Sequence, residues 1–419
     1  MEKFIIEGGK KLCGKVEIQS AKNSILPLVS ASIISGGKTR IKRCPKIKDV
    51  LVMCEIIREM GGKAEFFNED LLLDTARINT WELPRKLTGE IRASLFMVGA
   101  LLCRFNYASM RMPGGCNIGE RPIDIHVNSM RKLGVVVSEN EDIVFSGNLA
   151  KSGEVTLRFP SVGATENLMM CALKLKGRTV IKNCAKEPEI VDLQRYLNLI
   201  GGRVKGAGSS VIEIEGVDRF TKDEVSISPS LDRIELGTFL FAGASTGGEL
   251  EIRAKDIENY RGIIKIFENN ACKIYNNSDN IYYIGFSRPM KGFGKMVTGP
   301  YPEFPTDLHP QLIACGCSLV GLTAVEERVF PQRFGYVEQL KLLGANVGVY
   351  GNLCLASGGA LKGTTVSAGD LRGGAALVIA GLFAEGVTEV KNVGHVDRGY
   401  YKIEEKLASL GAKIKRVSY

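Results

Sequence analysis

One short pattern recurs six times along the chain and divides it into units of about seventy residues. In each copy an apolar, helix-like stretch ends at a Leu-Gly-like turn and runs directly into a short strand. The copies lie at residues 57–65, 130–137, 197–204, 266–274, 340–347 and 407–414. A glycine in the left-handed conformation commonly ends a helix, which explains its place between helix and strand. The sequence therefore predicts a fold built from six similar units.

A second pattern keeps the same phase and completes the unit. A turn, usually with glycine, precedes an alternating strand, and a polar loop follows that strand. These strands lie at residues 37–41, 108–112, 177–181, 248–252, 321–325 and 386–390. With the apolar helices between them, each unit reads as strand, helix, strand, helix and further strand, which is an α/β element. Because 419 residues are too many for one ordinary core, two or more domains are expected.

The composition excludes several classes of protein. The formal net charge is +9, from 55 Lys and Arg against 46 Asp and Glu. These basic residues are dispersed, which does not favour a nucleic-acid surface and suits small polyanions equally well. The 11 cysteines lack a CxxC or Cys/His cluster, which argues against a metal site and a disulfide framework. Without a signal-peptide pattern or a membrane-length apolar run, we expect a cytoplasmic protein that does not bind a membrane.

The loop Pro113-Gly-Gly-Cys-Asn-Ile-Gly-Glu-Arg-Pro-Ile-Asp124 combines three glycines, two prolines, a thiol and a guanidinium. Such a segment cannot form a regular helix or a central strand. It is read either as a surface turn with an incidental cysteine or as a mobile loop that presents a reactive thiol beside an anion. Cys116, Glu187, Phe330 and His395 occupy corresponding loops of four units. Several such loops can face one cleft if the units pack around pseudo-symmetry axes.

Eight short motifs resemble, in order and spacing, those of the UDP-N-acetylglucosamine enolpyruvyl transferases, the 1-carboxyvinyltransferases of the EPSP synthase family. The motifs are Ala21-Lys22-Asn23, the loop 113–124, Ser161-Val-Gly-Ala-Thr165, Glu187-Pro-Glu-Ile-Val-Asp192, Asp232-Arg-Ile-Glu235, Phe304-Pro-Thr-Asp307, Asp370-Leu-Arg372 and Asp397-Arg-Gly399. The resemblance runs from end to end. It implies an α/β fold, a two-domain inside-out α/β barrel with three units per domain. One domain would hold residues 22–230 with the Cys116 loop, the other residues 1–21 plus 231–419, and the active site would lie in the cleft between them.

The resemblance also implies an activity. The enolpyruvyl group of phosphoenolpyruvate would pass to the 3-hydroxyl of UDP-N-acetylglucosamine with release of phosphate, through a tetrahedral intermediate. This is the first committed step of peptidoglycan synthesis, and thus of cell wall biogenesis, cell shape and cell division. No cofactor or metal is implied, and we expect a monomer. The alternatives are transfer to shikimate 3-phosphate, a basic RNA-binding protein of similar repeats, and an inactive paralogue.

The resemblance assigns catalytic roles to four residues. Cys116 is the candidate acid and the site of a covalent phosphoenolpyruvate or pyruvate adduct, and fosfomycin is expected to alkylate it. A guanidinium at Arg121 would favour the thiolate and raise its reactivity. Asp307 is the candidate base, although a carboxylate after Pro-Thr is also typical of a helix N-cap. Lys22 and Arg398 are expected to bind the anionic groups of phosphoenolpyruvate.

A larger set is expected to bind the two substrates. Its members are Lys22, Asn23, Arg92, Arg121, Pro122, Ile123, Asp124, Ile125, Ser161, Val162, Gly163, Asp307, Val329 and Arg372. Small residues with exposed amides at 161–163 suit a diphosphate. Many members of the family carry a lysine just before this Ser-Val-Gly, where this chain has Phe159-Pro160. Arg158 is the nearest substitute cation, although strand alternation would turn it to the other face. His126 is expected to orient the loop.

Overall fold

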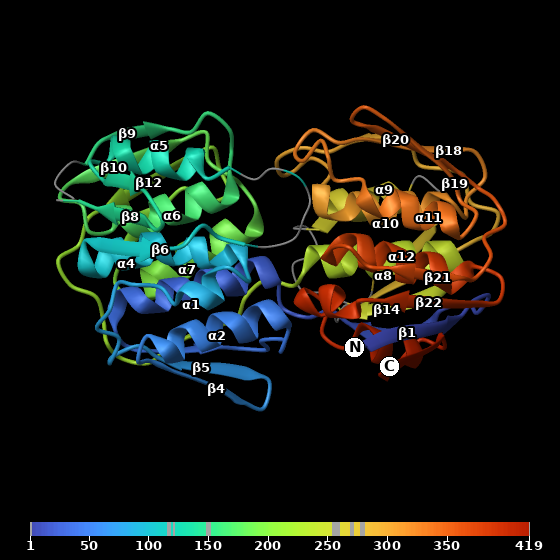
Figure 1. Ribbon diagram of the computed structural model, residues 1–419, viewed down its shortest axis with the longest axis horizontal. Helices are drawn as coiled ribbons and strands as arrows, with labels where there is room; N and C mark the ends of the chain where they lie inside the picture. The colour runs from blue at the N-terminus through green and yellow to red at the C-terminus, as the bar shows by residue number, and fades with distance from the viewer. Residues whose placement is uncertain are drawn as a thin grey trace. The chain divides into compact units, whose positions relative to one another are not determined.

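The computed structural model describes residues 2–114, 119, 122–147, 152–253, 260–268, 272–276 and 281–418. The chain divides into two compact units, one of residues 2–19 with 231–418 and the other of residues 20–114 with 122–230. In each unit of Figure 1, helices fill the interior and strands lie at the periphery. Within the described ranges no helix is long and apolar enough to cross a membrane.

The described strands form six sheets, and three of them belong to the unit of residues 20–230. Across these three sheets the hydrogen-bonded strands follow one another in the orders β13-β3-β5-β4, β6-β8-β7 and β11-β12-β10-β9. The strands are β3 (Lys38–Ile41), β4 (Lys63–Phe67), β5 (Asp70–Asp74), β6 (Tyr107–Met110), β7 (Val136–Glu139), β8 (Ile143–Ser146), β9 (Glu154–Thr156), β10 (Arg178–Lys182), β11 (Arg203–Lys205), β12 (Val211–Glu215) and β13 (Val225–Ile227). The helices are α1 (Lys22–Ser35), α2 (Lys48–Glu59), α3 (Arg85–Thr88), the 3-10 helix η1 (Arg92–Phe96), α4 (Met97–Phe105), α5 (Asp124–Lys132), α6 (Val162–Ala172) and α7 (Pro188–Leu199).

The other three sheets belong to the unit of residues 2–19 and 231–418, with strand orders β15-β16-β14-β2, β17-β18-β20-β19 and β21-β22-β1-β23. The strands are β1 (Glu2–Glu7), β2 (Cys13–Glu17), β14 (Glu249–Arg253), β15 (Cys272–Asn276), β16 (Ile281–Phe286), β17 (Gly294–Val297), β18 (Leu322–Glu326), β19 (Asn346–Tyr350), β20 (Leu353–Ser357), β21 (Thr365–Ser367), β22 (Val387–Lys391) and β23 (Lys413–Ser418). The helices are α8 (Arg233–Thr246), α9 (Arg261–Glu268), the 3-10 helix η3 (Thr306–Leu308), α10 (His309–Gly316), α11 (Gly335–Leu342), α12 (Leu371–Phe383), the 3-10 helix η4 (Val393–Arg398) and α13 (Ile403–Ser409).

The same strand order recurs in the four-stranded sheets, and it is seen most simply in the sheet of β17 to β20. A strand, a buried helix and a parallel second strand are followed by an outer helix and an antiparallel hairpin, as in β17-α10-β18-α11-β19-β20. Some sheets depart from this path in the described chain: β13, the parallel neighbour of β3, comes from the end of its unit, and the sheet of β6 has three strands. The last sheet obtains its fourth strand from the start of the chain. There β1 pairs antiparallel with both β22 and β23, taking the place that β20 has in its own sheet. Figure 1 accordingly shows the two termini close together on one sheet.

The core of each unit is a group of three buried helices, one from each repeat. Helices α1, α4 and α6 contact one another in one unit, and α8, α10 and α12 do so in the other. All residues of α1 except Asn23 and all of α12 except Phe383 are buried. A helix that is buried on every side needs no polar face, so beyond their first turn these two segments consist of apolar residues, glycine and serine.

The glycines of the Leu-Gly turns have the predicted conformation. Gly61, Gly134, Gly201, Gly344 and Gly411 have φ angles between 84° and 98°. In this region a side chain would be strained, whereas glycine is not. The sixth position, Asn270, lies outside the described residues. The expectation of six α/β units, three in each half, is confirmed by the six sheets of the described chain.

Candidate active site

Asp307 lies between two buried arginines in the unit that contains β1. Its Oδ1 accepts a hydrogen bond of 2.7 Å from Nη1 of Arg333, and its Oδ2 accepts bonds of 3.3 and 3.2 Å from Nε and Nη2 of Arg372. The arginine side chains are 5% and 2% exposed, whereas that of Asp307 is 28% exposed. The carboxylate is thus paired on both oxygens with arginines and still partly open to a reactant.

The N-cap interpretation of Asp307 is wrong. Residue Pro305 is the N-cap of η3, and the Asp307 carboxylate accepts from side chains rather than from the backbone of its own helix. Asp370 is an N-cap of this kind, but of another helix, α12: it accepts hydrogen bonds from the backbone N–H of Arg372 and Gly373. This cap orients the start of α12 and with it Arg372. Burial by itself would lower the pKa of Arg372, but Tyr400 and two carboxylates raise it.

Two further predicted residues lie in the same unit as Asp307. The backbone N–H of Val329 donates a hydrogen bond of 2.7 Å to Oε1 of the buried Glu327. Arg398 ends η4 and is half-buried. Its neighbour Asp397 accepts bonds of 2.9 and 2.7 Å from the guanidinium of Arg416 on β23. The C-terminal strand therefore anchors the loop that carries Arg398.

Lys22 is the first residue of α1 in the other unit and forms a buried ion pair. Its Nζ lies 2.7 Å from Oδ2 of Asp49 on α2. Asn23 follows at the only position of the helix that is not buried. Next along the chain, Ser24 donates a 2.7 Å hydrogen bond to Oδ2 of Asp192, which also accepts from the backbone N–H of Ser230. The start of α1 is thus tied to α2, to α7 and to the end of the unit.

The residues expected to bind the nucleotide sugar contact one another within this second unit. Arg92 donates a 3.1 Å hydrogen bond from Nη2 to the carbonyl oxygen of Pro122. Asp124, the first residue of α5, forms an ion pair with Arg158. Strand alternation therefore did not turn Arg158 away from this group. Ile123 is buried and Ile125 is half-buried.

The segment 161–163 opens α6 beside this group. Ser161 is the N-cap, and its Oγ accepts a hydrogen bond from the backbone N–H of Ala164 at 3.3 Å. Val162 is the first helical residue. A Cβ added to Gly163 would lie 2.9 Å from Cε1 of Phe96 and 3.0 Å from Cε1 of His126, so only glycine fits there without a shift. A helix start with a glycine in its first turn leaves room for an anion at its backbone amides.

His126 is an uncharged ring that orients this region. The side-chain oxygen of Asn167 accepts from the backbone N–H of Gly99 at 2.7 Å, so the Asn167 amide nitrogen donates to Nδ1 of His126 at 3.0 Å. The ring hydrogen then lies on Nε2. Burial, followed by the charge of Arg92, lowers the pKa of His126 to about 3. A ring that stays neutral at physiological pH is suited to orientation rather than to proton transfer.

Two of the expected residues, Cys116 and Arg121, lie outside the described part of the chain. Two residues that sequence reasoning did not select lie directly against the expected ones. Arg333 lies three residues after Phe330 in a polar loop, and a lone arginine on such a loop is usually solvated. Asp49 lies in an ordinary amphipathic helix and gives no local signal.

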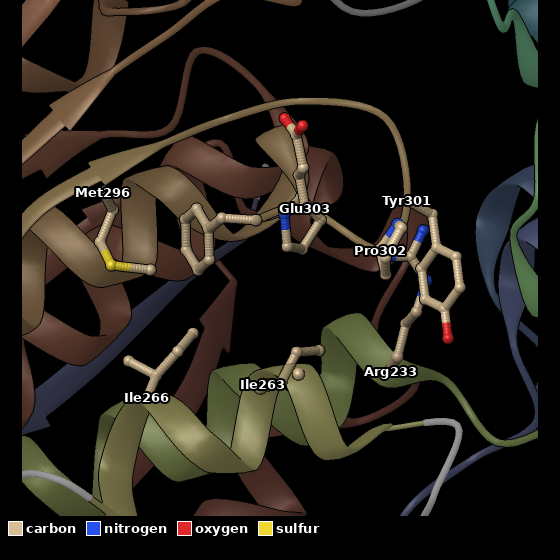
Figure 2. A pocket seen from close by; sticks show the side chains of 10 residues that line it. Arg233, Ile263, Ile266, Met296, Tyr301, Pro302 and Glu303 are labelled. Carbon is tan, nitrogen blue, oxygen red and sulfur yellow. The ribbon is translucent and has the colours of Figure 1, made fainter.

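A small pocket of about 90 Å³ is lined in part by residues 301–305, the segment that leads to Asp307. Figure 2 shows Ile263 and Ile266 of α9 on one side and residues 301–303 on the other, with Glu303 pointing away from the isoleucines. The guanidinium of Arg233 lies 5.8 Å from the centre of the Tyr301 ring. None of the expected site residues lines this pocket. Among the described residues no group of three His, Cys, Asp or Glu side chains is arranged to hold a metal ion.

The chain is similar to proteins of known family over its whole length. The family model of EPSP synthase (3-phosphoshikimate 1-carboxyvinyltransferase) matches residues 6–407. UDP-N-acetylglucosamine 1-carboxyvinyltransferase 2 of Caldanaerobacter subterraneus subsp. tengcongensis is 43% identical over 419 residues, and the match covers 100% of both chains. UDP-N-acetylglucosamine 1-carboxyvinyltransferase of Halothermothrix orenii is 39% identical over 418 residues, again with 100% of both chains covered.

Two solved structures are similar in fold. The enolpyruvyl transferase NikO from Streptomyces tendae has a TM-score of 0.89 at 23% identity, covering 100% of this chain and 99% of its own. EPSP synthase from Acinetobacter baumannii has a TM-score of 0.75 at 17% identity, covering 100% of both chains. The expected two-domain inside-out α/β barrel is therefore confirmed as the fold.

Proposed function

This chain belongs to the EPSP synthase family and, within it, to the UDP-N-acetylglucosamine 1-carboxyvinyltransferases, and we propose that it catalyses their reaction in peptidoglycan synthesis. It transfers the enolpyruvyl group of phosphoenolpyruvate to the 3-hydroxyl of UDP-N-acetylglucosamine and releases phosphate. The observation that carries this proposal is 43% identity to such an enzyme over the full length of both chains. The Asp307 carboxylate, which accepts hydrogen bonds from Arg333 and Arg372, supports the proposal, because the reaction needs a base beside fixed positive charge.

The chemistry divides into an addition and an elimination. In the addition, the sugar hydroxyl gives its proton to Asp307 and its oxygen bonds to C2 of phosphoenolpyruvate, while the methylene carbon takes a proton from Cys116. In the elimination, the methyl group of the tetrahedral intermediate returns a proton to the Cys116 thiolate, and the C2–O bond breaks with its electron pair on phosphate, which takes the proton held by Asp307. The enolpyruvyl double bond is restored, and no electron acceptor is required.

The other expected residues bind and orient the two anions. Lys22 and Arg398 receive the carboxylate and phosphate of phosphoenolpyruvate, and Arg121 and Arg372 add positive charge. Arginine suits these oxyanions because its planar fork donates two parallel hydrogen bonds. The contacts of Arg92 with Pro122 and of Asp124 with Arg158 support a nucleotide-sugar site at residues 122–125 and 161–163.

We also propose where the enzyme acts, its oligomeric state and its covalent chemistry. It acts in the cytoplasm as a monomer and without a cofactor, and a covalent adduct of phosphoenolpyruvate forms on Cys116. Fosfomycin inhibits it by alkylating the same thiol.

Phosphate release from phosphoenolpyruvate tests acceptor and chemistry together. The purified protein is given phosphoenolpyruvate with UDP-N-acetylglucosamine, with shikimate 3-phosphate, or with neither. Phosphate should appear only with UDP-N-acetylglucosamine, together with a product heavier by one enolpyruvyl group. Release with shikimate 3-phosphate alone would move the chain to the other acceptor, and no release with either would overturn the proposal. Steeply salt-dependent RNA binding by such an inactive protein would favour the RNA-binding alternative.

A further inference from the structure

His309 and Glu327 form a buried pair in the unit that contains Asp307, and neither has a role in the mechanism above. His309 is the first residue of α10, and Glu327 directly follows β18; both side chains are 0% exposed. Nδ1 of His309 lies 2.7 Å from Oε2 of Glu327, and Nε2 lies 3.0 Å from the carbonyl oxygen of Arg333. The ring is stacked on Phe334, with 5.4 Å between ring centres.

These contacts fix the number of protons that the pair holds. A carbonyl oxygen can only accept, so Nε2 must carry a hydrogen. At 2.7 Å, two lone pairs on Nδ1 and Oε2 would repel each other, so a second proton lies in that contact as well. The pair therefore retains one proton more than a neutral ring beside a carboxylate. Burial would raise the pKa of Glu327, but hydrogen bonds led by that from His309 lower it to about 2. Burial lowers the pKa of His309, and the hydrogen bond with Glu327 acts in the opposite direction. The second proton is therefore assigned from the 2.7 Å contact between Nδ1 and Oε2, where it joins the ring to the carboxylate.

Glu327 joins two loops through five hydrogen bonds. Its Oε1 accepts from the hydroxyl of Thr298 and from the backbone N–H of Val329 and Phe330, at 2.9, 2.7 and 2.8 Å. Its Oε2 accepts from the hydroxyl of Thr306 at 2.8 Å as well as from His309. One carboxylate thereby holds the segment on each side of Asp307 against the segment that carries Val329.

The pair reaches the Asp307 carboxylate by two routes. Thr306, which donates to Glu327, precedes Asp307 in the chain. Arg333, whose carbonyl oxygen accepts from His309, turns its guanidinium onto Asp307 Oδ1 at 2.7 Å and onto Thr306 Oγ1 at 3.1 Å. Both the backbone of Asp307 and its main cationic partner are therefore fixed by the same two side chains.

We propose that His309 and Glu327 are positioning residues for Asp307, and that their shared proton locks residues 306–309 against residues 327–333. The proposal rests on the proposed function, in which Asp307 accepts the proton of the sugar hydroxyl. A base must be held in hydrogen-bond reach of that proton, and a misplacement of about 1 Å can cost about a hundredfold in rate.

Replacing His309 separates its two contacts. His309→Asn keeps a donor near the position of Nδ1, His309→Gln keeps one near that of Nε2, and His309→Leu keeps neither. We expect His309→Leu to lower kcat about a hundredfold with little change in the KM for UDP-N-acetylglucosamine. His309→Asn should recover most of that loss, because it restores the donor to Glu327. Should His309→Leu fail to fold, the Asn and Gln variants are compared with each other. The kcat of His309→Asn should then exceed that of His309→Gln, and equal kcat values would contradict the proposal.

Ile313→Val is the matched control. Ile313 lies on α10, is 0% exposed and belongs to the hydrophobic core, so its truncation lowers the melting temperature without touching the pair. Its kcat should stay at the wild-type value. A wild-type kcat in His309→Leu would overturn the positioning role, as would an equal loss of kcat in His309→Leu and Ile313→Val at equal loss of melting temperature.

A spectroscopic measurement tests the pair independently of turnover. The chain has 3 histidines, so the imidazole 15N resonances can be assigned from the His309 variants. Both ring nitrogens of His309 should be protonated at neutral pH with slow hydrogen exchange, and a singly protonated ring would overturn the proposal. Lack of acceptor-dependent phosphate release by the wild type would instead overturn the proposed function and leave this proton count standing.

Discussion

Arg333 donates a 2.7 Å hydrogen bond from Nη1 to Oδ1 of Asp307, and only 5% of the Arg333 side chain is exposed. Arg372 approaches the other carboxylate oxygen and is 2% exposed. A surface ion pair is worth little, but a pair built on buried arginines has few alternative geometries. Asp307 is therefore a partly open carboxylate held between two buried, positively charged side chains.

Replacing Asp307 with Asn should abolish turnover and preserve the fold. Asn keeps the volume of the side chain but cannot accept a proton, and general-base catalysis typically contributes about 10²–10⁴-fold. We expect kcat to fall by that factor in the phosphate-release assay, with an unchanged circular dichroism spectrum. Glu303→Gln is the control, since Glu303 is an exposed carboxylate four residues earlier. Near-normal turnover in Asp307→Asn would remove this residue from the mechanism.

Replacing Arg158 with Ala should weaken nucleotide-sugar binding without destabilising the protein. The Arg158 side chain is 65% exposed, so its ion pair with Asp124 contributes at most about 1 kcal/mol to stability. If its guanidinium takes the place of the lysine that the family carries before Ser161, the KM for UDP-N-acetylglucosamine should rise about tenfold, the equivalent of 1.4 kcal/mol. The KM for phosphoenolpyruvate should not change.

Arg178→Ala provides the comparison for Arg158. Arg178 lies in the same unit, is 59% exposed and also pairs with one carboxylate, that of Glu213. Its replacement should leave both KM values at their wild-type level. Equal KM values for UDP-N-acetylglucosamine in the two variants would show that Arg158 contributes nothing to the site.

Replacing Glu166 with Gln should change how stability depends on pH. Glu166 is 0% exposed, and neither of its carboxylate oxygens has a hydrogen-bond partner in the described structure. Burial, and then the charges of Glu189 and Glu187, raise its pKa well above the ordinary 4.5. Above that pH the unfolded chain releases a proton that the folded protein retains, so this residue makes stability fall as pH rises, by about 1.4 kcal/mol per pH unit.

The Gln variant cannot release this proton, so its stability should fall less steeply than that of the wild type. Urea midpoints at several pH values between 5 and 8 measure this, and the difference between the proteins should grow with pH in favour of the variant. Glu59→Gln, at an exposed position of α2, should follow the wild type. Parallel curves for wild type and Glu166→Gln would mean that Glu166 is not protonated in the folded state.

The repeat was predictable from sequence because its signal is local. Gly61 and Gly344 mark the same turn of different repeats, since a positive φ there favours glycine whatever the surroundings. The closing of the last sheet by β1 was not derivable in this way. It depends on pairing between residues such as Ile5 and Lys415, which lie at opposite ends of the chain. Local patterns carry no information on such a register.

The site was predictable where a motif carries the chemistry and not where tertiary packing does. Asp307 was selected from its motif, whereas its partner Arg333 and the pair of His309 and Glu327 become visible only when two loops meet. Glu187 and Glu189 show the same limit. Their sequence is compatible with solvated carboxylates, yet they are only 6% and 3% exposed. The roles of individual site residues stay predictions, with Cys116 and Arg121 outside the described part of the chain.

Fosfomycin should react selectively with Cys116, because most of the other thiols are buried. Of the ten cysteines that the structure describes, eight are buried. Burial raises the pKa of thiols such as Cys54, Cys171 and Cys315 to about 12, so they present almost no thiolate at neutral pH. Cys13 is the described cysteine that is exposed, which makes it the internal competitor.

We expect fosfomycin to add once per chain, by attack of the Cys116 thiolate on an epoxide carbon, and to abolish phosphate release in proportion to the mass adduct. Cys116→Ser should take up no fosfomycin, because a serine hydroxyl is not ionised at neutral pH, whereas Cys13→Ser should react like the wild type. Peptide mapping after timed exposure measures both. An adduct on Cys13, or full activity after prolonged exposure without an adduct, would show that the 113–124 loop does not present an activated thiol, and the assignment of Cys116 as the acid would lose its chemical basis.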